Sequence, residues 1–171
     1  MSLLYPDMLK NRITDITPDD LKKLGVCGLL LDVDNTLTTH GSQVLDPAIS
    51  DWIDNMKSLG FIPTIVSNAP PGRVAPFAKR LGLRYISFAC KPFPIGFIRG
   101  ARRLGLKRKE CVAIGDQTFT DIIGANLAGV HSIQLLPILP EHQITLRFKR
   151  RFEGYILKRY RKKQKKSYTN S

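Results

Sequence analysis

The chain has 171 residues, of which 43% are hydrophobic and 24% are charged, and its net charge is +13. This length fits one domain with a sizeable core, and the composition is ordinary for a globular protein. The sequence has no apolar run near the roughly 20 residues of a membrane span, and its first residues lack the pattern of a signal peptide. These features exclude a membrane-spanning protein, and we expect a cytoplasmic one.

The positive charge is concentrated in one segment. Residues 147–166 contain eleven Lys or Arg and one Glu, so they supply +10 of the net charge of +13. We therefore expect the globular part to be nearly balanced and the basic segment to meet an anionic surface or polymer. Two partners fit this segment: an anionic membrane, which would place the protein peripherally at its inner face, and RNA.

The predicted elements begin with a short helix that Thr17 can cap, with Pro18 in its first position. The first strand is expected over residues 26–31, and a polar loop follows it. From there, four helices each end at a glycine and precede an apolar segment, as helices with a C-terminal glycine cap do. The helices are expected over residues 47–59, 73–81, 95–104 and 119–128, and the strands that follow them over residues 61–66, 83–88, 111–115 and 131–135.

This alternation predicts an α/β fold with a doubly wound, Rossmann-like parallel sheet and helices on both faces. We assign residues 1–142 to this domain, with its core in residues 26–136. Residues 143–171 are expected to form a basic amphipathic helix and a disordered tail. The apolar stripe of that helix could instead pack on the sheet as a last core helix.

Two carboxylates follow the first predicted strand directly. Six largely apolar residues lead into Asp32 and Asp34, as in a strand buried on both faces of a parallel sheet. In a continuing strand these side chains would point the same way into one pocket, where two like charges need a cation or a shared proton. The alternative is a surface turn, in which Asp and Asn are common.

Further polar residues follow the other predicted strands: Ser67 with Asn68, then Lys91, then Asp116 and Asp121. Each has a structural alternative as a turn, a solvated charge or a helix cap. The carboxyl ends of parallel strands share one edge of a sheet, so we expect all of these side chains to converge there. No glycine-rich nucleotide-binding motif is present.

Such a cluster suits phosphoryl transfer. Carboxylates bind Mg²⁺, while a hydroxyl and an ammonium can hold phosphate oxygens. One carboxylate can attack phosphorus and form an aspartyl-phosphate, while its neighbour protonates the leaving alcohol.

These motifs, Asp32-Val33-Asp34-Asn35-Thr36, Ser67, Lys91-Pro92 and Gly115-Asp116 with Asp121, resemble the four-motif set of haloacid dehalogenase (HAD) superfamily phosphatases. The resemblance covers roughly residues 26–136. It implies that Asp32 is the nucleophile and that Asp34 is the general acid and base.

The same resemblance implies that Ser67 and Lys91 bind phosphate, and we add Asn68 to this group. Mg²⁺ would be held by Asp32, by Asp116 and by the backbone carbonyl of Asp34. Asp121 would lie in the outer metal shell or orient Lys91.

A narrower likeness rests on residues 15–18 (Asp-Ile-Thr-Pro), 66–69 (Val-Ser-Asn-Ala) and 91–94 (Lys-Pro-Phe-Pro). These are similar to the subclass IIIA, YqeG-type bacterial phosphatases, a group that resembles mitochondrial phosphatidylglycerophosphate phosphatases.

The intervals between the motifs are too short to contain a cap domain over the site. An open site favours a large substrate, such as a lipid headgroup, a protein or a nucleic-acid end, unless an oligomer partner closes it. We therefore expect a Mg²⁺-dependent phosphomonoester hydrolase acting on a membrane lipid phosphate such as phosphatidylglycerophosphate. The alternatives are a phosphatase for nucleotides, nucleic-acid ends or sugar phosphates, and an RNA- or ribosome-binding protein with vestigial catalysis.

Overall fold

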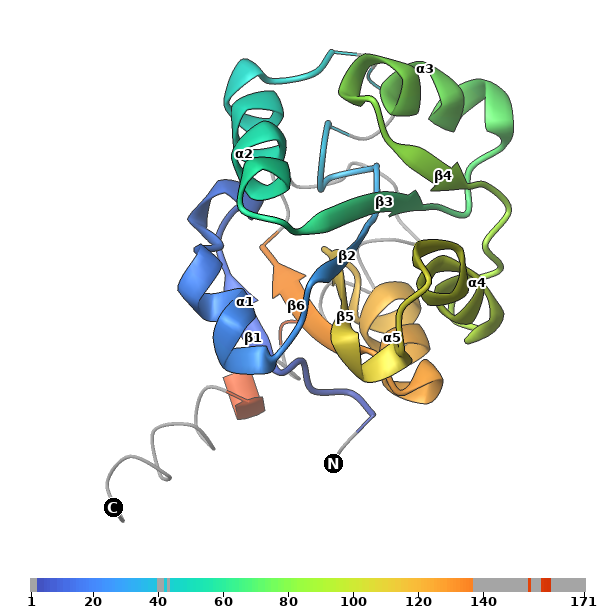
Figure 1. The fold of residues 1–171 in the computed structure, drawn as a ribbon. Coiled ribbons are helices and arrows are strands. Elements are labelled where there is room, and N and C mark those ends of the chain that lie inside the picture. Colours follow the sequence, from blue (N-terminus) through green and yellow to red (C-terminus); the bar gives the residue numbers. More distant parts are fainter. Residues whose placement is uncertain (1–2, 40–41, 43, 137–153, 155–157, 161–171) are drawn as a thin grey trace.

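The computed structural model describes residues 3–39, 42, 44–136, 154 and 158–160 (Figure 1). Six strands form one parallel sheet, which confirms the predicted α/β fold. From edge to edge they are β1 (Met8–Lys10), β6 (His131–Leu135), β5 (Cys111–Gly115), β2 (Gly28–Leu31), β3 (Ile62–Val66) and β4 (Arg84–Ile86). Within the described residues, no helix has both the length and the apolar character needed to cross a membrane.

Helices cover both faces of this sheet (Figure 1). The helices α1 (Pro18–Leu24), α2 (Pro47–Ser58) and α3 (Pro71–Leu81) pack on one face, and α4 (Ile95–Leu104) and α5 (Ile123–Ala128) pack on the other. Successive side chains of a strand point to opposite faces. Accordingly, Leu29 and Leu31 of β2 belong to the first core and Leu30 to the second. Strand β2 is therefore apolar at every position except Gly28.

The predicted helix ends are present. The Thr17 hydroxyl accepts a hydrogen bond from the Asp20 N–H at 3.2 Å, and the Asp20 carboxylate accepts one from the Thr17 N–H at 2.9 Å. This reciprocal pair satisfies backbone donors at the start of α1. The helices α3, α4 and α5 end at glycines with φ of +59°, +73° and +69°. The glycines in the sequence therefore marked the C-terminal ends of these three helices correctly.

Apart from shifts of one or two residues at other boundaries, the structure differs from the prediction at three places. Strand β1 was not predicted; it has three residues and pairs with β6 on one side. Strand β4 is limited to Arg84–Ile86, one residue shorter at its start and two residues shorter at its end than predicted. The helix predicted over residues 119–128 begins instead as a wide π-helical turn over Thr118–Ile122, which continues into α5.

The predicted domain boundary at residue 142 lies outside the described residues, as does most of the predicted apolar stripe near the end of the sequence. One residue of that stripe is described. Tyr160 is buried, its ring centroid lies 5.7 Å from that of Tyr5, and its hydroxyl donates to the Asp7 carbonyl at 3.3 Å.

The order of the strands determines where a ligand can bind. The chain adds β3 and β4 on one side of β2 and then returns to place β5 on the other side. At such a reversal the connections leave in opposite directions, which opens a crevice at the carboxyl ends of the two strands. Asp32 follows β2 and Asp116 follows β5, so both lie at this crevice.

Gly96 provides a test of the packing behind this crevice. It occupies the second position of α4, where an added Cβ would lie 2.5 Å from the Ala89 carbonyl oxygen and 2.7 Å from the Ala89 Cβ. We expect Gly96→Ala to lower the free energy of unfolding by about 1–3 kcal/mol, because backbone would have to move. Urea denaturation measures this value.

The matched control is Gly72→Ala, at the second position of α3, where no heavy atom lies within 4 Å of an added Cβ. There we expect no loss, and a gain of about 0.4–1 kcal/mol, because alanine restricts the unfolded chain more than glycine does. Equal losses in the two variants would contradict the packing argument.

Candidate active site

The centre of the site is a buried lysine between two carboxylates. The Lys91 Nζ lies 2.7 Å from Asp32 Oδ1 and 2.6 Å from Asp121 Oδ1. All three side chains are buried, and that of Lys91 is only 2% exposed. Asp32 is held at the sheet because its N–H donates to the Ile114 carbonyl at 3.0 Å, which continues the pairing of β2 with β5. These three residues come together as predicted from their positions after strands.

Asp116 brings a third carboxylate to this cluster. It follows β5 and is fully buried, and oxygens of Asp32, Asp116 and Asp121 lie within 4.8 Å of one another. The cluster contains only oxygen donors, which suit Mg²⁺ better than the softer transition metals. The single Lys91 ammonium offsets only part of the negative charge of the three carboxylates, so a divalent cation would reduce their repulsion. The residues therefore fit a Mg²⁺ site.

The position of Asp121 depends on a glycine. The Gln117 N–H donates to Asp121 Oδ2 at 3.1 Å, which leaves the other oxygen directed at Lys91. A Cβ at Gly115 would overlap the Asp121 carboxylate. The last residue of β5 must therefore be glycine for this carboxylate to reach the site.

The loop that carries Lys91 is fixed by Asn68. Its side-chain amide donates to the Lys91 carbonyl at 2.9 Å, and its side-chain oxygen accepts from the Lys91 N–H at 2.7 Å. The neighbouring Ser67 is buried, and its hydroxyl oxygen accepts from the Ala69 N–H at 3.2 Å. Asn68 thus joins the end of β3 to the loop after β4 and positions the lysine.

Asp34 has surroundings that differ from those of Asp32. The chain turns directly after it, because Asn35 has a φ of +58° and the Asn35 N–H donates to the Thr38 carbonyl. The Asp34 Oδ1 lies 2.7 Å from an Arg73 guanidinium nitrogen. Asp32 and Asp34 were predicted to share one pocket, but the structure groups Asp32 with Asp116 and Asp121, whereas the Asp34 carboxylate is directed at Arg73.

Arg73 was not identified from the sequence. Its guanidinium also donates to the Ser42 carbonyl and lies 5.3 Å from the centre of the Phe77 ring. Arg73 therefore ties the loop before α2 to Asp34. One signal was available: a cation in the first turn of a helix is unfavourable next to the helix dipole, so Arg73 at the start of α3 needed an acidic partner.

The buried charges alter the acidity of two groups. Burial raises the pKa of Asp32 to about 6, although the Lys91 ammonium opposes this shift. Burial alone would lower the pKa of Lys91, but the carboxylates of Asp121 and Asp32 raise it above its usual value. Lys91 therefore remains a cation, while the raised pKa of Asp32 means that this carboxyl loses its proton at a higher pH than an ordinary aspartate does.

This arrangement defines a class of protein. A family model described as haloacid dehalogenase-like hydrolase matches residues 33–129, which include Asp34, Ser67, Lys91, Asp116 and Asp121. The chain belongs to this family. The solved structure of an uncharacterized protein from Listeria monocytogenes serotype 4b shares the fold, with a TM-score of 0.57 and 22% identity over 69% of this chain and 85% of that one.

Curated relatives place the chain more closely. The probable phosphatase YqeG of Bacillus subtilis (strain 168) is 38% identical over 158 residues, which are 92% of each chain. The phosphatidylglycerophosphate phosphatase 1 of Arabidopsis thaliana, chloroplastic/mitochondrial, is 27% identical over 162 residues, and these are 88% of this chain and 46% of that protein. The chain thus spans about half the length of the plant relative and nearly all of the bacterial one. It is a phosphatase of this family, as predicted.

The raised pKa of Asp32 predicts how stability depends on pH without metal. Protonated Asp32 stabilises the fold, and this contribution is complete below the ordinary value of 3.8 and is lost as the pH rises through about 6. In a chelator, we expect wild type to lose on the order of 2 kcal/mol of unfolding free energy relative to Asp32→Asn between pH 4 and pH 7. Urea denaturation at stepped pH measures this difference.

The exposed Asp54, at 68% side-chain exposure on α2, supplies the control. Asp54→Asn should follow the wild type across this range. A gain of the wild type over Asp32→Asn with rising pH would show that Asp32 is more acidic in the folded state than in the unfolded state.

Proposed function

We propose that the protein is a Mg²⁺-dependent phosphomonoester hydrolase that acts through an aspartyl-phosphate on Asp32. The observation that carries the proposal is the buried cluster at the carboxyl ends of β2 and β5, where Lys91 lies within 2.7 Å of Asp32. A nucleophile beside a fixed cation is the arrangement that attack on an anionic phosphate requires.

In the first step, a carboxylate oxygen of Asp32 attacks phosphorus as the bond from phosphorus to the leaving alcohol breaks. Asp34 delivers a proton to the leaving oxygen. In the second step, Asp34 takes a proton from water, the water oxygen attacks phosphorus, and inorganic phosphate leaves Asp32. Because the Asp34 carboxylate is bonded to Arg73, we propose that it exchanges this partner for the leaving oxygen when substrate binds.

Two side chains are suited to hold the phosphate. The Lys91 ammonium can contact the oxygens on which charge accumulates, and the buried Ser67 hydroxyl can donate to another. We assign Asn68 a positioning role through its two bonds to the Lys91 backbone, in place of the predicted phosphate contact. Asp121 orients Lys91 from the other side at 2.6 Å.

The metal would be held by the Asp32 and Asp116 carboxylates and the backbone carbonyl of Asp34, with Asp121 beside them. Bound Mg²⁺ would supply positive charge that reduces the repulsion between the attacking carboxylate and the phosphate. The carboxylates are held in place by the protein itself, because Gly115 and Lys91 fix Asp121 and the sheet fixes Asp32.

For the substrate, we propose a membrane lipid phosphate. The name of the plant relative specifies phosphatidylglycerophosphate. Between Asp34 and Lys91 the described residues form only a loop, α2, β3, α3 and β4, so none of them makes a further domain over the site. A site without a further domain over it suits a headgroup that stays in its bilayer.

The covalent step is tested with Asp32→Asn. An amide is not a nucleophile here, so we expect phosphate release from an aryl phosphate to fall by at least about a thousandfold. Asp54→Asn, on the exposed face of α2, should keep normal activity. Near-normal turnover of Asp32→Asn would refute the aspartyl-phosphate.

The acid role is tested with Asp34→Asn. This change should slow the hydrolysis of substrates with poor leaving groups most, because those depend on protonation. Equal losses for all leaving groups would contradict the acid role.

The metal site is tested with Asp116→Asn. We expect Mg²⁺ affinity, measured by titration calorimetry, to fall by at least about tenfold, because one charged oxygen ligand is lost. Activity should fall in parallel, and a chelator should silence the wild type reversibly. Unchanged Mg²⁺ affinity in Asp116→Asn, or full wild-type activity in excess chelator, would show that the metal assignment is wrong.

A further inference from the structure

The globular part of the chain carries its charge unevenly. Residues 55–109 contain twelve Lys or Arg and no Asp or Glu, whereas residues 1–54 contain nine Asp and only four Lys or Arg. The nearly balanced total expected from the sequence hid this division. The acid-free stretch runs from the end of α2 through β3, α3, β4 and α4, so one half of the sheet and its helices are basic (Figure 1).

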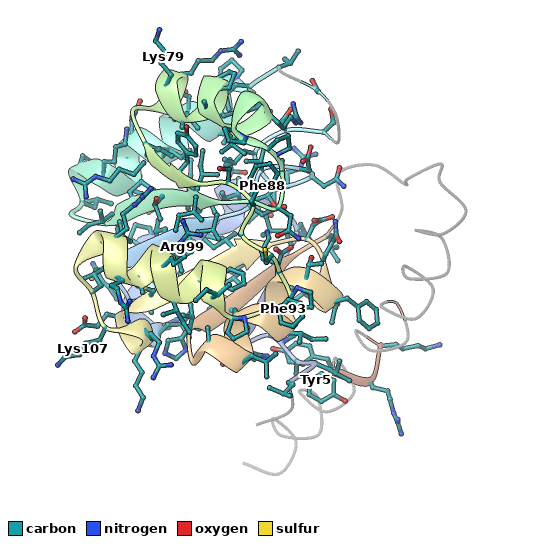
Figure 2. All side chains as sticks on the ribbon, turned by 90° about the vertical axis from the view of Figure 1, so that its right-hand side faces the viewer. Tyr5, Lys79, Phe88, Phe93, Arg99 and Lys107 are labelled. Atoms are coloured by element: carbon teal, nitrogen blue, oxygen red, sulfur yellow. The ribbon has the colours of Figure 1, made fainter. Side chains whose placement is uncertain are left out.

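Large apolar side chains are exposed within the same half. Phe88 is 59% exposed, Phe93 is 69% exposed and Ile95 is 51% exposed. Phe88 and Phe93 flank Lys91 in the loop before α4, so they lie at the rim of the active site. They share the face shown in Figure 2 with Arg99. Exposed aromatic side chains next to a catalytic lysine are typical of a binding surface.

The backbone of this loop holds Phe88 in an unfavourable conformation. Its φ is +46°, a region that bulky residues rarely adopt, and Cys90 also has a positive φ of +57°. The Phe88 N–H donates to the Ala69 carbonyl at 3.2 Å, and Asn68 fixes the next turn through Lys91. The loop therefore keeps a strained backbone conformation together with an exposed aromatic ring, although neither stabilises the isolated protein.

Cations lie beside these apolar groups. Ile95, Arg99 and Arg102 are spaced by four and three residues, so they share one side of α4. Arg99 and Arg103 also line a groove of about 590 Å³ along β4, together with Arg84 and Tyr85. We call Phe88, Phe93, Ile95, Arg99 and Arg102 the α4 face; all five residues are exposed.

We propose that the α4 face docks the active site on an anionic lipid bilayer. Phe88, Phe93 and Ile95 enter the headgroup region, where aromatic and aliphatic side chains are favoured. Arg99 and Arg102 lie farther along α4 and contact lipid phosphates, whose attraction for each cation is appreciable near a charged surface. This inference rests on the proposed lipid substrate, and it places the loop that carries Lys91 next to the headgroups.

The observations favour lipid over RNA. RNA would also attract the arginines, and phenylalanine rings could stack on its bases. Ile95 has no ring for stacking, yet it is half exposed, two residues after Phe93 and four before Arg99. A bilayer accommodates all three apolar side chains at once, whereas stacking accounts for only two of them.

Insertion is tested with a fluorescent reporter at the face. Phe93→Trp is mixed with vesicles of phosphatidylglycerol and phosphatidylcholine, and its emission is compared with that of Leu59→Trp, an exposed apolar position at the end of α2. We expect a blue shift, and quenching by brominated acyl chains, for Phe93→Trp alone. The native Trp52 is buried against Ile16 and gives a constant background. Equal responses from the two variants would overturn the proposal.

The charge contribution is tested by sedimentation with the same vesicles. We expect Arg99→Gln combined with Arg102→Gln to weaken binding on the order of tenfold, and Phe93→Ser to weaken it similarly. Lys22→Gln combined with Lys23→Gln removes the same charge from α1 and should leave binding unchanged. Equal binding by all of these proteins would show that the basic segment near residue 160, and not the α4 face, meets the membrane.

Hydrolysis of a soluble aryl phosphate separates this inference from the proposed function. Mg²⁺-dependent hydrolysis without insertion of the Phe93→Trp reporter overturns docking and leaves the phosphatase proposal intact. Insertion without hydrolysis would overturn the phosphatase proposal and leave the docking proposal intact. Absence of vesicle binding by the wild type at low salt, together with tight RNA binding that Arg99→Gln combined with Arg102→Gln weakens, would assign the face to nucleic acid.

Discussion

The desolvation of charge at the end of β2 is the constraint on which the site depends. A carboxylate buried there is unfavourable unless a cation or a proton accompanies it. Lys91 supplies the cation, but it comes from a loop on the far side of β3, so the loop must be held at a fixed distance. Asn68 does this through the backbone of Lys91, and Asp121 does it through the ammonium. The glycine before Asp116 is needed for the same reason, because it admits Asp121.

The arrangement of the sheet could be predicted because two levels of the sequence agree. Apolar runs give the strands, and glycines after each helix mark the returns, so the alternation implies a parallel sheet and a common edge for the polar residues. Strand β1 escaped prediction because three residues carry no periodic pattern; its pairing with β6 provides its backbone partners. The π-helical turn at Thr118–Ile122 escaped prediction because no sequence pattern distinguishes it from an α-helical start; in the structure the Asp121 carboxylate of this turn packs directly against Gly115.

The site was predictable in its members but only partly in its contacts. Convergence at one edge follows from topology, whereas the partner of each carboxylate depends on the path of single loops. The turn at Asn35 directs Asp34 to Arg73, and nothing in the spacing of the two aspartates reveals it. The uneven charge was visible in the sequence. The fold was needed to show that the basic residues belong to one end of the sheet, formed by β3, β4 and the helices α3 and α4 on its two faces.

Strand β4 is the outermost strand on its side of the sheet, and its arginines have a consequence for folding. An uncovered strand offers unpaired backbone groups to other chains, and charged side chains are one way in which proteins discourage such pairing. Arg103 donates to the Tyr85 carbonyl, and Arg84 donates to the Arg103 carbonyl, so guanidinium groups occupy this border. Besides its place in the basic half of the molecule, this pair of guanidinium groups therefore discourages folded chains from pairing edge to edge along β4.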